Sequence, residues 1–369
     1  MTLRISGARI DHTATGEQEL SASVGDQRLW FRVPRDWPAR LSGDPFAIAA
    51  LLPAMRLGIP LQLDDELPVS PALLDNLQRI QAVFRLWGPA LRQPFRIVPV
   101  HAASAAPGHR ASSVVSFFSG GIDGFYTMLH ARQRITHGVF SRGIDMQLAN
   151  PVWDEAYTRN AAWLADREVP LVPIATNARF VGHAFGIPWG TYFGAGLAAM
   201  GHVLGAGTVV VAAGHTWREL WPDGSHPLTD PLWSSDTTTV VHHGREAKRW
   251  QKLAAIAAVP GVLDVLRVCW QDRGYNCGEC EKCLRTMVLL RILGLESRAF
   301  PPLTTLRRVA HLRPSDRSEA CFVEEALSLA TTRGDMAVAA ALRASLRRWH
   351  RRRFAVEIKE LLLGAVRRA

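Results

Sequence analysis

The chain has 369 residues, of which 48% are hydrophobic, so it can bury a large core and is expected to form more than one domain. Its formal net charge of +10 permits a nucleic acid or another acidic partner. No apolar run is long enough to span a bilayer, and the N-terminus has no apolar segment typical of a signal peptide. We therefore expect a cytoplasmic protein without a membrane partner.

Residues 1–105 are predicted to form an α+β accessory domain. A β pattern covers residues 28–33, and a helix is expected to begin at Ser70 and Pro71. The apolar residues that fall on one face of this helix are Leu73, Leu77, Ile80 and Phe84. The small, polar, turn-rich segment 101–113 indicates a linker to the next domain.

From residue 114 to residue 213 the hydrophobic pattern alternates between strand and helix. Strands are expected over 114–118, 138–140, 169–175 and 208–213, and helices from about residue 124, over 156–165 and over 192–204. This alternation is typical of an α/β fold with a doubly wound parallel sheet and helices on both faces. Ligands of such sheets bind at the carboxyl ends of the strands.

A glycine-rich loop, residues 119–124 with the sequence SGGIDG, follows the first of these strands. Gly120 and Gly121 let backbone N–H groups approach an anion, Ser119 adds a hydroxyl, and the next helix offers its positive N-terminus. The loop lacks the Gly-Lys-Ser/Thr of a Walker A motif, so phosphate binding without γ-phosphoryl transfer is favoured. A generic glycine turn before a helix is the alternative.

Four of the five cysteines are clustered with the spacing C-x7-C-x2-C-x2-C, and they are Cys269, Cys277, Cys280 and Cys283. Cys-x-x-Cys spacing supplies two thiolates to one tetrahedral ion, and Gly278 permits the tight turn between them. Four cysteines fill all positions, which predicts a closed, structural Zn site. A redox pair or a chance grouping of thiols are the alternatives. The fifth, Cys321, is expected to be a core residue.

Other polar and aromatic residues fall at loops where a ligand can bind. Asp145 follows the second strand, and the candidate cations are Arg179, Arg245, Lys248 and Arg249, each of which also fits a surface role. A segment rich in Trp, His and Asp follows the fourth strand. Its candidates are Trp217, Trp221 and Trp233 for stacking, Asp230 and Asp236 as acceptors, and His215, His242 and His243 for a substrate pocket.

The loop resembles the pyrophosphatase loop Ser-Gly-Gly-x-Asp-Ser of enzymes that cleave ATP between the α and β phosphates. Together with the cysteine spacing, it makes residues 112–300 similar to the 7-cyano-7-deazaguanine synthase family, a branch of the ATP pyrophosphatases with a PP-loop fold of the HUP type. The resemblance implies that Zn binds the four cysteines, and that ATP and Mg bind Ser119, Gly120, Gly121, Asp123 and Gly124. Gly124 departs from the family's final serine.

The resemblance also implies a reaction. The family adenylates 7-carboxy-7-deazaguanine, lets ammonia attack to give an amide, and dehydrates the amide to a nitrile with a second ATP. We assign catalytic roles to Asp123, Asp145 and Lys248 on this basis. The expected partners are a deazapurine substrate and ammonia or another amine donor.

Residues 301–369 are predicted to form a basic helical tail. Residues 332–369 contain ten Lys and Arg against three Asp and Glu. Such a tail suits tRNA or another acidic partner, and equally a solvated helical face. Because the tail and the N-terminal domain extend the family core, a specialised relative is one hypothesis. It would conjugate the deazaguanine to a protein or nucleic-acid acceptor, as relatives in anti-phage defence loci are thought to do, and a homodimer is one option for its assembly.

Two further functions compete with the synthase hypothesis. Similar ATP pyrophosphatases thiolate tRNA, which would require a sulfur-carrying cysteine outside the zinc set, and only Cys321 is available. The other is non-enzymatic: a zinc-stabilised basic module that binds RNA or DNA.

Overall fold

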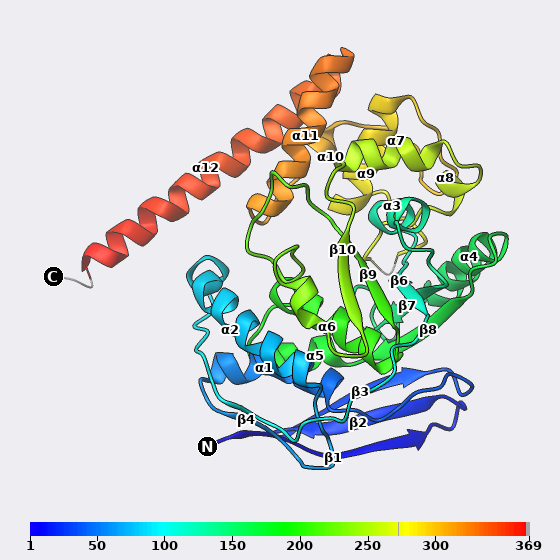
Figure 1. Cartoon of the computed structure of the whole chain (residues 1–369). Coiled ribbons are helices and arrows are strands. Elements are labelled where there is room, and N and C mark those ends of the chain that lie inside the picture. The colour runs from blue at the N-terminus through cyan, green and yellow to red at the C-terminus, as the bar shows by residue number, and fades with distance from the viewer. Residues whose placement is uncertain (272, 367–369) are drawn as a thin grey trace. The chain divides into compact units, whose positions relative to one another are not determined.

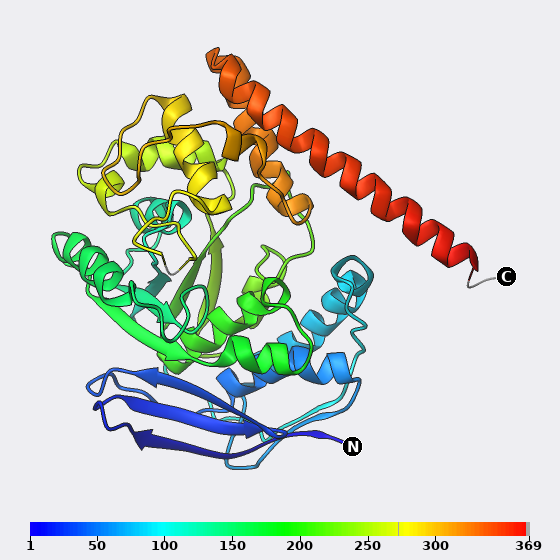
Figure 2. The same cartoon turned by 180° about the vertical axis from the view of Figure 1, so that it is seen from behind.

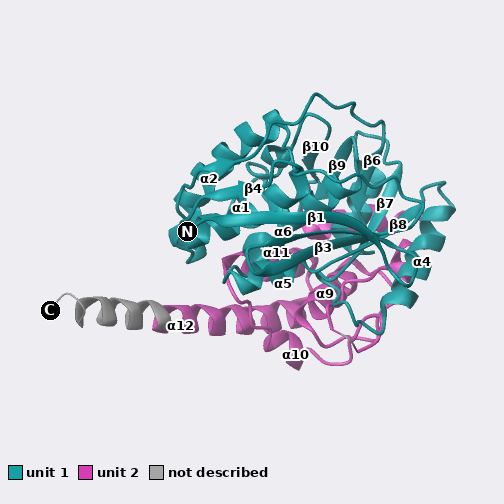
Figure 3. Ribbon diagram, turned by 90° about the horizontal axis from the view of Figure 1, so that it is seen from below, with its two compact units in different colours: residues 1–246 teal, residues 247–369 magenta. Residues whose placement is uncertain are grey.

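The computed structural model describes residues 1–271 and 273–366, with side chains through residue 355. Its contacts divide the chain into two compact units, Met1–Glu246 and Ala247–Ala369, which are coloured separately in Figure 3. Among the described residues, no helix combines the length and the apolar character that crossing a bilayer requires.

The ten strands of the described residues all belong to the first unit. They are β1 (Leu3–His12), β2 (Gln18–Val24), β3 (Gln27–Val33), β4 (Leu61–Leu63), β5 (Val100–His101), β6 (Val114–Phe117), β7 (His137–Arg142), β8 (Leu171–Thr176), β9 (Thr208–Ala212) and β10 (Thr239–His243). The helices of this unit are α1 (Asp44–Leu57), α2 (Pro71–Leu91), α3 (Ile122–His130), α4 (Trp153–Ala165), α5 (Ala178–Ala184), α6 (Trp189–Val203) and the short 3-10 helix η1 (Asp230–Trp233).

The strands form one sheet in the order β10-β9-β6-β7-β8-β3-β2-β1-β4-β5. The five strands from β10 to β8 are all parallel, which confirms the expected α/β class and its parallel sheet. β10 was missing from the sequence prediction, because it follows a long irregular segment. The chain reverses its direction of travel across the sheet between β6 and β9, so the carboxyl ends of these two strands flank the position where doubly wound sheets bind ligands.

Helices cover both faces of the parallel strands (Figures 1 and 2). α3 and α4 pack on one face, and α6, with α1 and α5 beside it, packs on the other. Gly201 lies where α6 packs against β9, and a Cβ there would lie 2.4 Å from a methyl carbon of Val209. This glycine therefore allows α6 to approach β9 closely.

The N-terminal segment contributes a mixed extension of this sheet, in which β1, β2 and β3 pair antiparallel and β4 and β5 add parallel pairs. β3 pairs with β8 through Phe31 and Thr176, so residues 1–105 and the alternating region share one sheet. Helix α2 begins after Ser70, and its four apolar residues named above are buried, as the sequence predicted. The two compact units show which segments contact one another, and they do not show which segments fold independently. The predicted domains 1–105, 112–300 and 301–369 therefore stay predictions.

The second unit is helical, as the sequence indicated. Its helices are α7 (Arg249–Ala257), α8 (Val262–Val265), α9 (Glu281–Leu293), α10 (Arg307–Ala310), α11 (Arg317–Arg333) and α12 (Met336–Val366). α12 packs against α10 and α11, and α9 packs against α7 and α11. Cys321 lies in α11, where it is 6% exposed and its thiol contacts the Ser318 carbonyl at 2.9 Å, in agreement with a core position.

Candidate functional site

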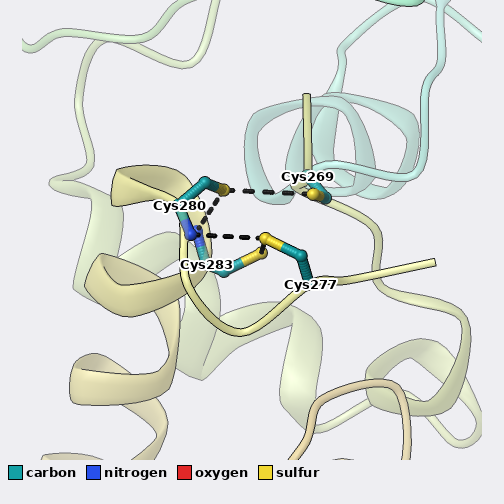
Figure 4. Close-up of side chains that lie close together, drawn as sticks. All are labelled: Cys269, Cys277, Cys280 and Cys283. Carbon is teal, nitrogen blue, oxygen red and sulfur yellow. Dashed lines mark hydrogen bonds between the residues drawn. The ribbon is translucent and has the colours of Figure 1, made fainter. Parts of the chain in front are cut away.

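The four clustered cysteines converge in the second unit with the geometry of a metal site. Their sulfur atoms all lie within 4.8 Å of one another, and Figure 4 shows the side chains pointing toward a common centre. The Sγ atoms of Cys269 and Cys280 are 3.9 Å apart, and those of Cys277 and Cys283 are 4.0 Å apart. A tetrahedral zinc with Zn–S bonds of about 2.3 Å requires sulfurs about 3.8 Å apart. The cluster can therefore hold a metal ion and is compatible with zinc.

The backbone around the cluster supports sulfur atoms that carry negative charge. Cys277 Sγ accepts N–H groups from Glu279 at 3.4 Å and from Cys280 at 3.3 Å, and Cys280 Sγ accepts from Cys283 at 3.4 Å as the N-cap of α9. Such N–H donors orient thiolates and stabilise their charge. Gly278 adopts a φ of +68°, and a Cβ there would lie 2.4 Å from Pro301, so the expected tight turn requires glycine.

Asn276 fixes the first cysteine to the rest of the cluster. Its Oδ1 accepts the N–H groups of Val268 at 3.0 Å and Cys269 at 3.2 Å, and its Nδ2 donates to the carbonyls of Leu266 and Ala299. This buried amide joins the segment before the cluster to the segment after α9. Asn276 could not be predicted as part of the site, because an asparagine in a loop carries no signal of its own.

The ionisation of Cys269, Cys280 and Cys283 is linked by the hydrogen bonds between their thiols. Hydrogen bonds from Cys280 lower the pKa of Cys269, whereas the hydrogen bond with Cys269 raises the pKa of Cys280 to about 11. The hydrogen bond with Cys269 also raises the pKa of Cys283. Ionisation of Cys269 therefore disfavours ionisation of Cys280 and Cys283. A divalent cation would stabilise the cysteines of the cluster as thiolates.

The glycine-rich loop joins β6 to α3 in the first unit. Ser119 is exposed, Gly120 has a φ of +77°, and Gly121 is the extended N-cap of α3, with no side-chain cap on the helix N-terminus. A Cβ on Gly120 would lie 2.6 Å from Asn160 Oδ1 in α4. Positive φ and close packing both require glycine here, and the backbone N–H groups at the start of α3, which receive no side-chain cap from Gly121, suit an anion.

Asn160 is a buried polar residue beneath this loop that the sequence analysis missed. It is fully buried, its Nδ2 donates to the Ala156 carbonyl at 2.7 Å, and its Oδ1 has no hydrogen-bond partner in the described part of the chain. A buried acceptor without a partner is costly, so it is usually retained for a purpose. Here it is available to an N–H group of the loop.

Gly124 and Asp123 lie in the first turn of α3. Gly124 has no positive φ, and a Cβ there would be 3.6 Å or more from its nearest neighbours, so a serine fits this position. Asp123 is half-buried beside the helix N-terminus, where the helix dipole favours a carboxylate.

The segments after β9 and β10 meet near the same edge of the sheet. The Trp217 N–H donates to the Arg245 carbonyl at 3.2 Å, and the Arg245 guanidinium lies 3.8 Å from the centroid of the Trp217 ring. The Trp217 side chain is 55% exposed. An exposed indole with a cation on one face leaves its other surface available to a planar ligand.

Residues of α3 hold the end of β10. The Tyr126 hydroxyl donates to Glu246 at 2.8 Å, and Thr127 Oγ1 lies 3.1 Å from His243 Nδ1. Burial, reinforced by the Glu246 carboxylate, raises the pKa of Tyr126 to about 12, so the phenol stays protonated and can donate. The structure therefore brings His243, a predicted pocket residue, to the helix that starts at the glycine-rich loop.

Three predicted substrate contacts are buried or bind neighbouring groups of the chain. Trp233 is fully buried, so it cannot stack on a ligand. Asp230 is 1% exposed and lies 2.6 Å from both His242 Nδ1 and Ser225 Oγ. Asp236 accepts the Ser70 hydroxyl at 2.5 Å and so anchors the start of α2. Both aspartates thus bind neighbouring groups of the chain, and their contact with a substrate edge stays a prediction.

Asp145 follows β7, which pairs with β6, and Arg179 follows β8, which pairs with β7. Asp145 is exposed and accepts the Trp189 indole N–H at 3.1 Å, whereas Arg179 donates to the Ile144 carbonyl at 2.7 Å. Arg179 is thus bonded to the residue that precedes Asp145, and Asp145 itself is bonded to Trp189. Their roles toward a nucleotide stay predictions.

Lys248 and Arg249 belong to the second unit. The Lys248 N–H donates to Gln251 Oε1 at 2.9 Å at the start of α7, and the Arg249 guanidinium lies 3.9 Å from the Phe322 ring centroid. Arg249 thereby packs α7 against α11. The catalytic role assigned to Lys248 stays a prediction.

No protein-family model matches the chain, and no curated protein or solved structure matches it either. The fold class and the cysteine geometry therefore rest on the sequence and the structure alone.

Proposed function

We propose that the chain is an ATP-dependent, AMP-forming enzyme that adenylates a carboxylated 7-deazaguanine and aminates it toward an amide or nitrile. The observation that carries the proposal is the glycine-rich loop. It lies at the reversal of strand order, its backbone conformation requires glycine at Gly120, and the uncapped start of α3 follows it.

Adenylation and amination require a site that binds phosphate, and they do not require a nucleophilic side chain of the protein. A substrate carboxylate oxygen attacks the α-phosphorus of ATP, and pyrophosphate leaves. Ammonia then attacks the acyl carbon, the bond to AMP breaks, and a proton is lost to give the amide. A second ATP would activate the amide oxygen in the same way, so that loss of AMP and a proton leaves the nitrile. The work of the protein is positioning and charge neutralisation.

Specific residues of the first unit fit parts of this scheme. Ser119 and the N–H groups near Gly121 would hold the departing pyrophosphate. Asp123 would help to hold Mg, whose role is to neutralise phosphate charge. Trp217, with its exposed ring, would stack on the planar deazapurine. A closed set of four cysteines leaves no position for a reacting water, so zinc would stabilise the second unit.

The competing functions receive less support from the structure. Thiolation of tRNA would need Cys321 as sulfur carrier, but this thiol is 6% exposed and packed within α11. Conjugation to a protein or nucleic-acid acceptor uses the same acyl-adenylate and differs only in the amine. It therefore releases the same AMP and pyrophosphate, and the mass of the product separates the two reactions.

The test is release of AMP and pyrophosphate from ATP by the full chain with a panel of carboxylated deazapurines and ammonia. We expect AMP only in the presence of a carboxylated substrate, and a loss of rate in Ser119→Ala. Ser112→Ala is the matched control, because Ser112 is exposed at the opposite end of β6. AMP release that is independent of carboxylate, or equal in both variants, would overturn the proposal.

A further inference from the structure

Helix α12 presents an unusually cationic surface. Between Met336 and Ala355 the chain has six arginines and no acidic residue. One face of the helix is buried through Leu342, Ser345 and Trp349, and the Ser345 hydroxyl donates to the Leu312 carbonyl at 2.9 Å. The exposed residues on the remaining surface are Arg343, Arg347, Arg348, His350, Arg351, Arg352 and Arg353. Packing thus fixes the helix and directs its arginines outward.

Part of this surface forms a cavity with the chain that follows α10. The cavity has a volume of about 390 Å³ and is lined by His311, Arg313, Arg348, Arg351 and Arg352. Arg348 donates to the Ala310 carbonyl, which holds its guanidinium against the end of α10. Arg313 is held by its backbone, whose N–H donates to Glu281 at 2.8 Å. The lining is therefore built on packed helices on both sides.

The charge of this cavity is not balanced within the described part of the chain. Four guanidinium groups give it a formal charge of +4. By contrast, Arg273, Arg291, Arg308 and Arg317 of this unit form ion pairs with carboxylates. No described carboxylate lies within ion-pair distance of Arg313, Arg348, Arg351 or Arg352.

Repulsion between the arginines of α12 destabilises the helix, and a bound polyanion would remove this repulsion. Arg343 and Arg347, Arg347 and Arg351, and Arg348 and Arg352 are each four residues apart, and like charges at that spacing destabilise a helix by about 0.2–0.5 kcal/mol per pair. A single phosphate cannot neutralise four guanidinium groups. A chain of phosphates can, and guanidinium groups bind phosphate oxygens in a bidentate manner.

We propose that Arg313, Arg348, Arg351 and Arg352 form a binding site for the phosphate backbone of a nucleic acid. The charge continues along α12 from Arg343 to Arg353, which spans about 15 Å of helix. That length matches about four phosphates along one strand. Phe354, 65% exposed, lies beside the arginines and offers a face on which a base can stack. The site is independent of the ATP-dependent activity proposed above.

The test measures binding of fluorescein-labelled 20-mers to the full chain by fluorescence anisotropy at 50, 100 and 200 mM KCl. Single-stranded RNA, double-stranded RNA and double-stranded DNA are compared. We expect binding that weakens with salt. In Arg351→Gln/Arg352→Gln, binding at 50 mM KCl should weaken roughly tenfold or more, and the slope of log Kd against log salt should fall by about 2.

Two further variants separate the site from general charge and from misfolding. Arg351→Lys/Arg352→Lys keeps the charge, so it should keep most of the salt slope. Arg132→Gln/Arg134→Gln removes two exposed arginines of the first unit and should bind as the wild type does. The proposal is overturned if the wild-type chain binds none of the three nucleic acids at 50 mM KCl, if the control pair weakens binding as much as the α12 pair, or if phosphatidylserine vesicles bind while nucleic acids do not.

Discussion

Gly120 in the glycine-rich loop and Asn160 in α4 are packed so closely that a Cβ on the glycine would lie 2.6 Å from Asn160 Oδ1. Asn160 is fully buried, and its Oδ1 has no partner among the described residues. A side chain at position 120 would therefore have to displace a buried amide. The loop conformation and the α4 core are therefore linked through these two residues. A substitution at either one should be felt at the other.

The first prediction concerns Gly120→Ala. An alanine at a φ of +77° costs about 1–2 kcal/mol, and its Cβ must displace the Asn160 amide. Displaced loop N–H groups should reduce AMP formation by roughly tenfold to a hundredfold. The measurement is the initial rate of AMP release with the melting temperature in parallel. Gly190→Ala is a control of the same chemistry, because no atom lies near its Cβ position and its φ is not positive. Equal rates for wild type and Gly120→Ala would contradict the role of the loop.

The second prediction concerns the position where the loop departs from the family pattern. Gly124→Ser introduces the family's hydroxyl at a site where a Cβ has ordinary contacts, so the fold should be unchanged. One additional hydrogen bond of about 1 kcal/mol would tighten ATP binding about fivefold. Isothermal titration with ATP and Mg measures the effect, and Gly124→Ala separates the hydroxyl from the added methyl group. Weaker binding by the serine variant than by the alanine variant would show that the hydroxyl does not reach the nucleotide.

The third prediction concerns the cysteine cluster. Cys283→Ser removes a buried ligand, so bound zinc should fall from about one ion per chain to well below one. The melting temperature should fall by roughly 5 °C or more, because structural zinc contributes directly to folding. Metal content and melting temperature are measured together. Cys321→Ser changes a buried cysteine outside the cluster and should keep its zinc. Zinc retained in full by Cys283→Ser would contradict the four-ligand site.

The sequence predicted the parts of the fold that depend on local pattern. The parallel strands and their helices follow from alternating hydrophobic runs, and the cysteine cluster follows from spacing, because nearby ligands in sequence converge on one turn and one helix start. The glycine conformation at Gly120 was likewise signalled by the residue type. These features need few contacts between distant segments.

Features that depend on distant contacts were missed or misassigned. Asn160 lies in α4, forty residues after Gly120 in the sequence, and nothing local indicates that it lies beneath the loop. Trp233 and Asp236 looked like ligand contacts because they lie in a long polar segment, but tertiary packing buries the first and joins the second to Ser70. Continuation of the parallel sheet into β3 depends on a pairing that a sequence pattern cannot specify.

The fourth prediction concerns acid stability. Burial lowers the pKa of His226 below its ordinary value of 6.5. The folded state therefore binds this proton less readily than the unfolded state, and the stability present above pH 6.5 is lost as the pH falls through the folded pKa. His226→Asn can retain the acceptor for the Leu228 N–H, so its melting temperature should fall less between about pH 7.5 and 5.5 than that of the wild type. His12→Asn, at an exposed position, should follow the wild type. If His226→Asn lost stability as steeply as the wild type, other groups would cause the acid sensitivity. One of them is His137, because burial lowers its pKa as well.

The fifth prediction concerns the exposed indole of Trp217. Stacking of an aromatic ring on a planar ligand contributes about 0.5–1.5 kcal/mol, so Trp217→Ala should raise the KM for the deazapurine roughly 2- to 10-fold with little change in the KM for ATP. Its side chain is 55% exposed, so the melting temperature should change little. Trp217→Phe keeps a stacking face and should recover most of the affinity. Leu86→Ala removes another exposed apolar side chain of the same unit, 74% exposed, and should leave both KM values unchanged. If Trp217→Ala raised the KM for ATP instead, the indole would contact the nucleotide, and the deazapurine would have to bind elsewhere along the carboxyl ends of the strands.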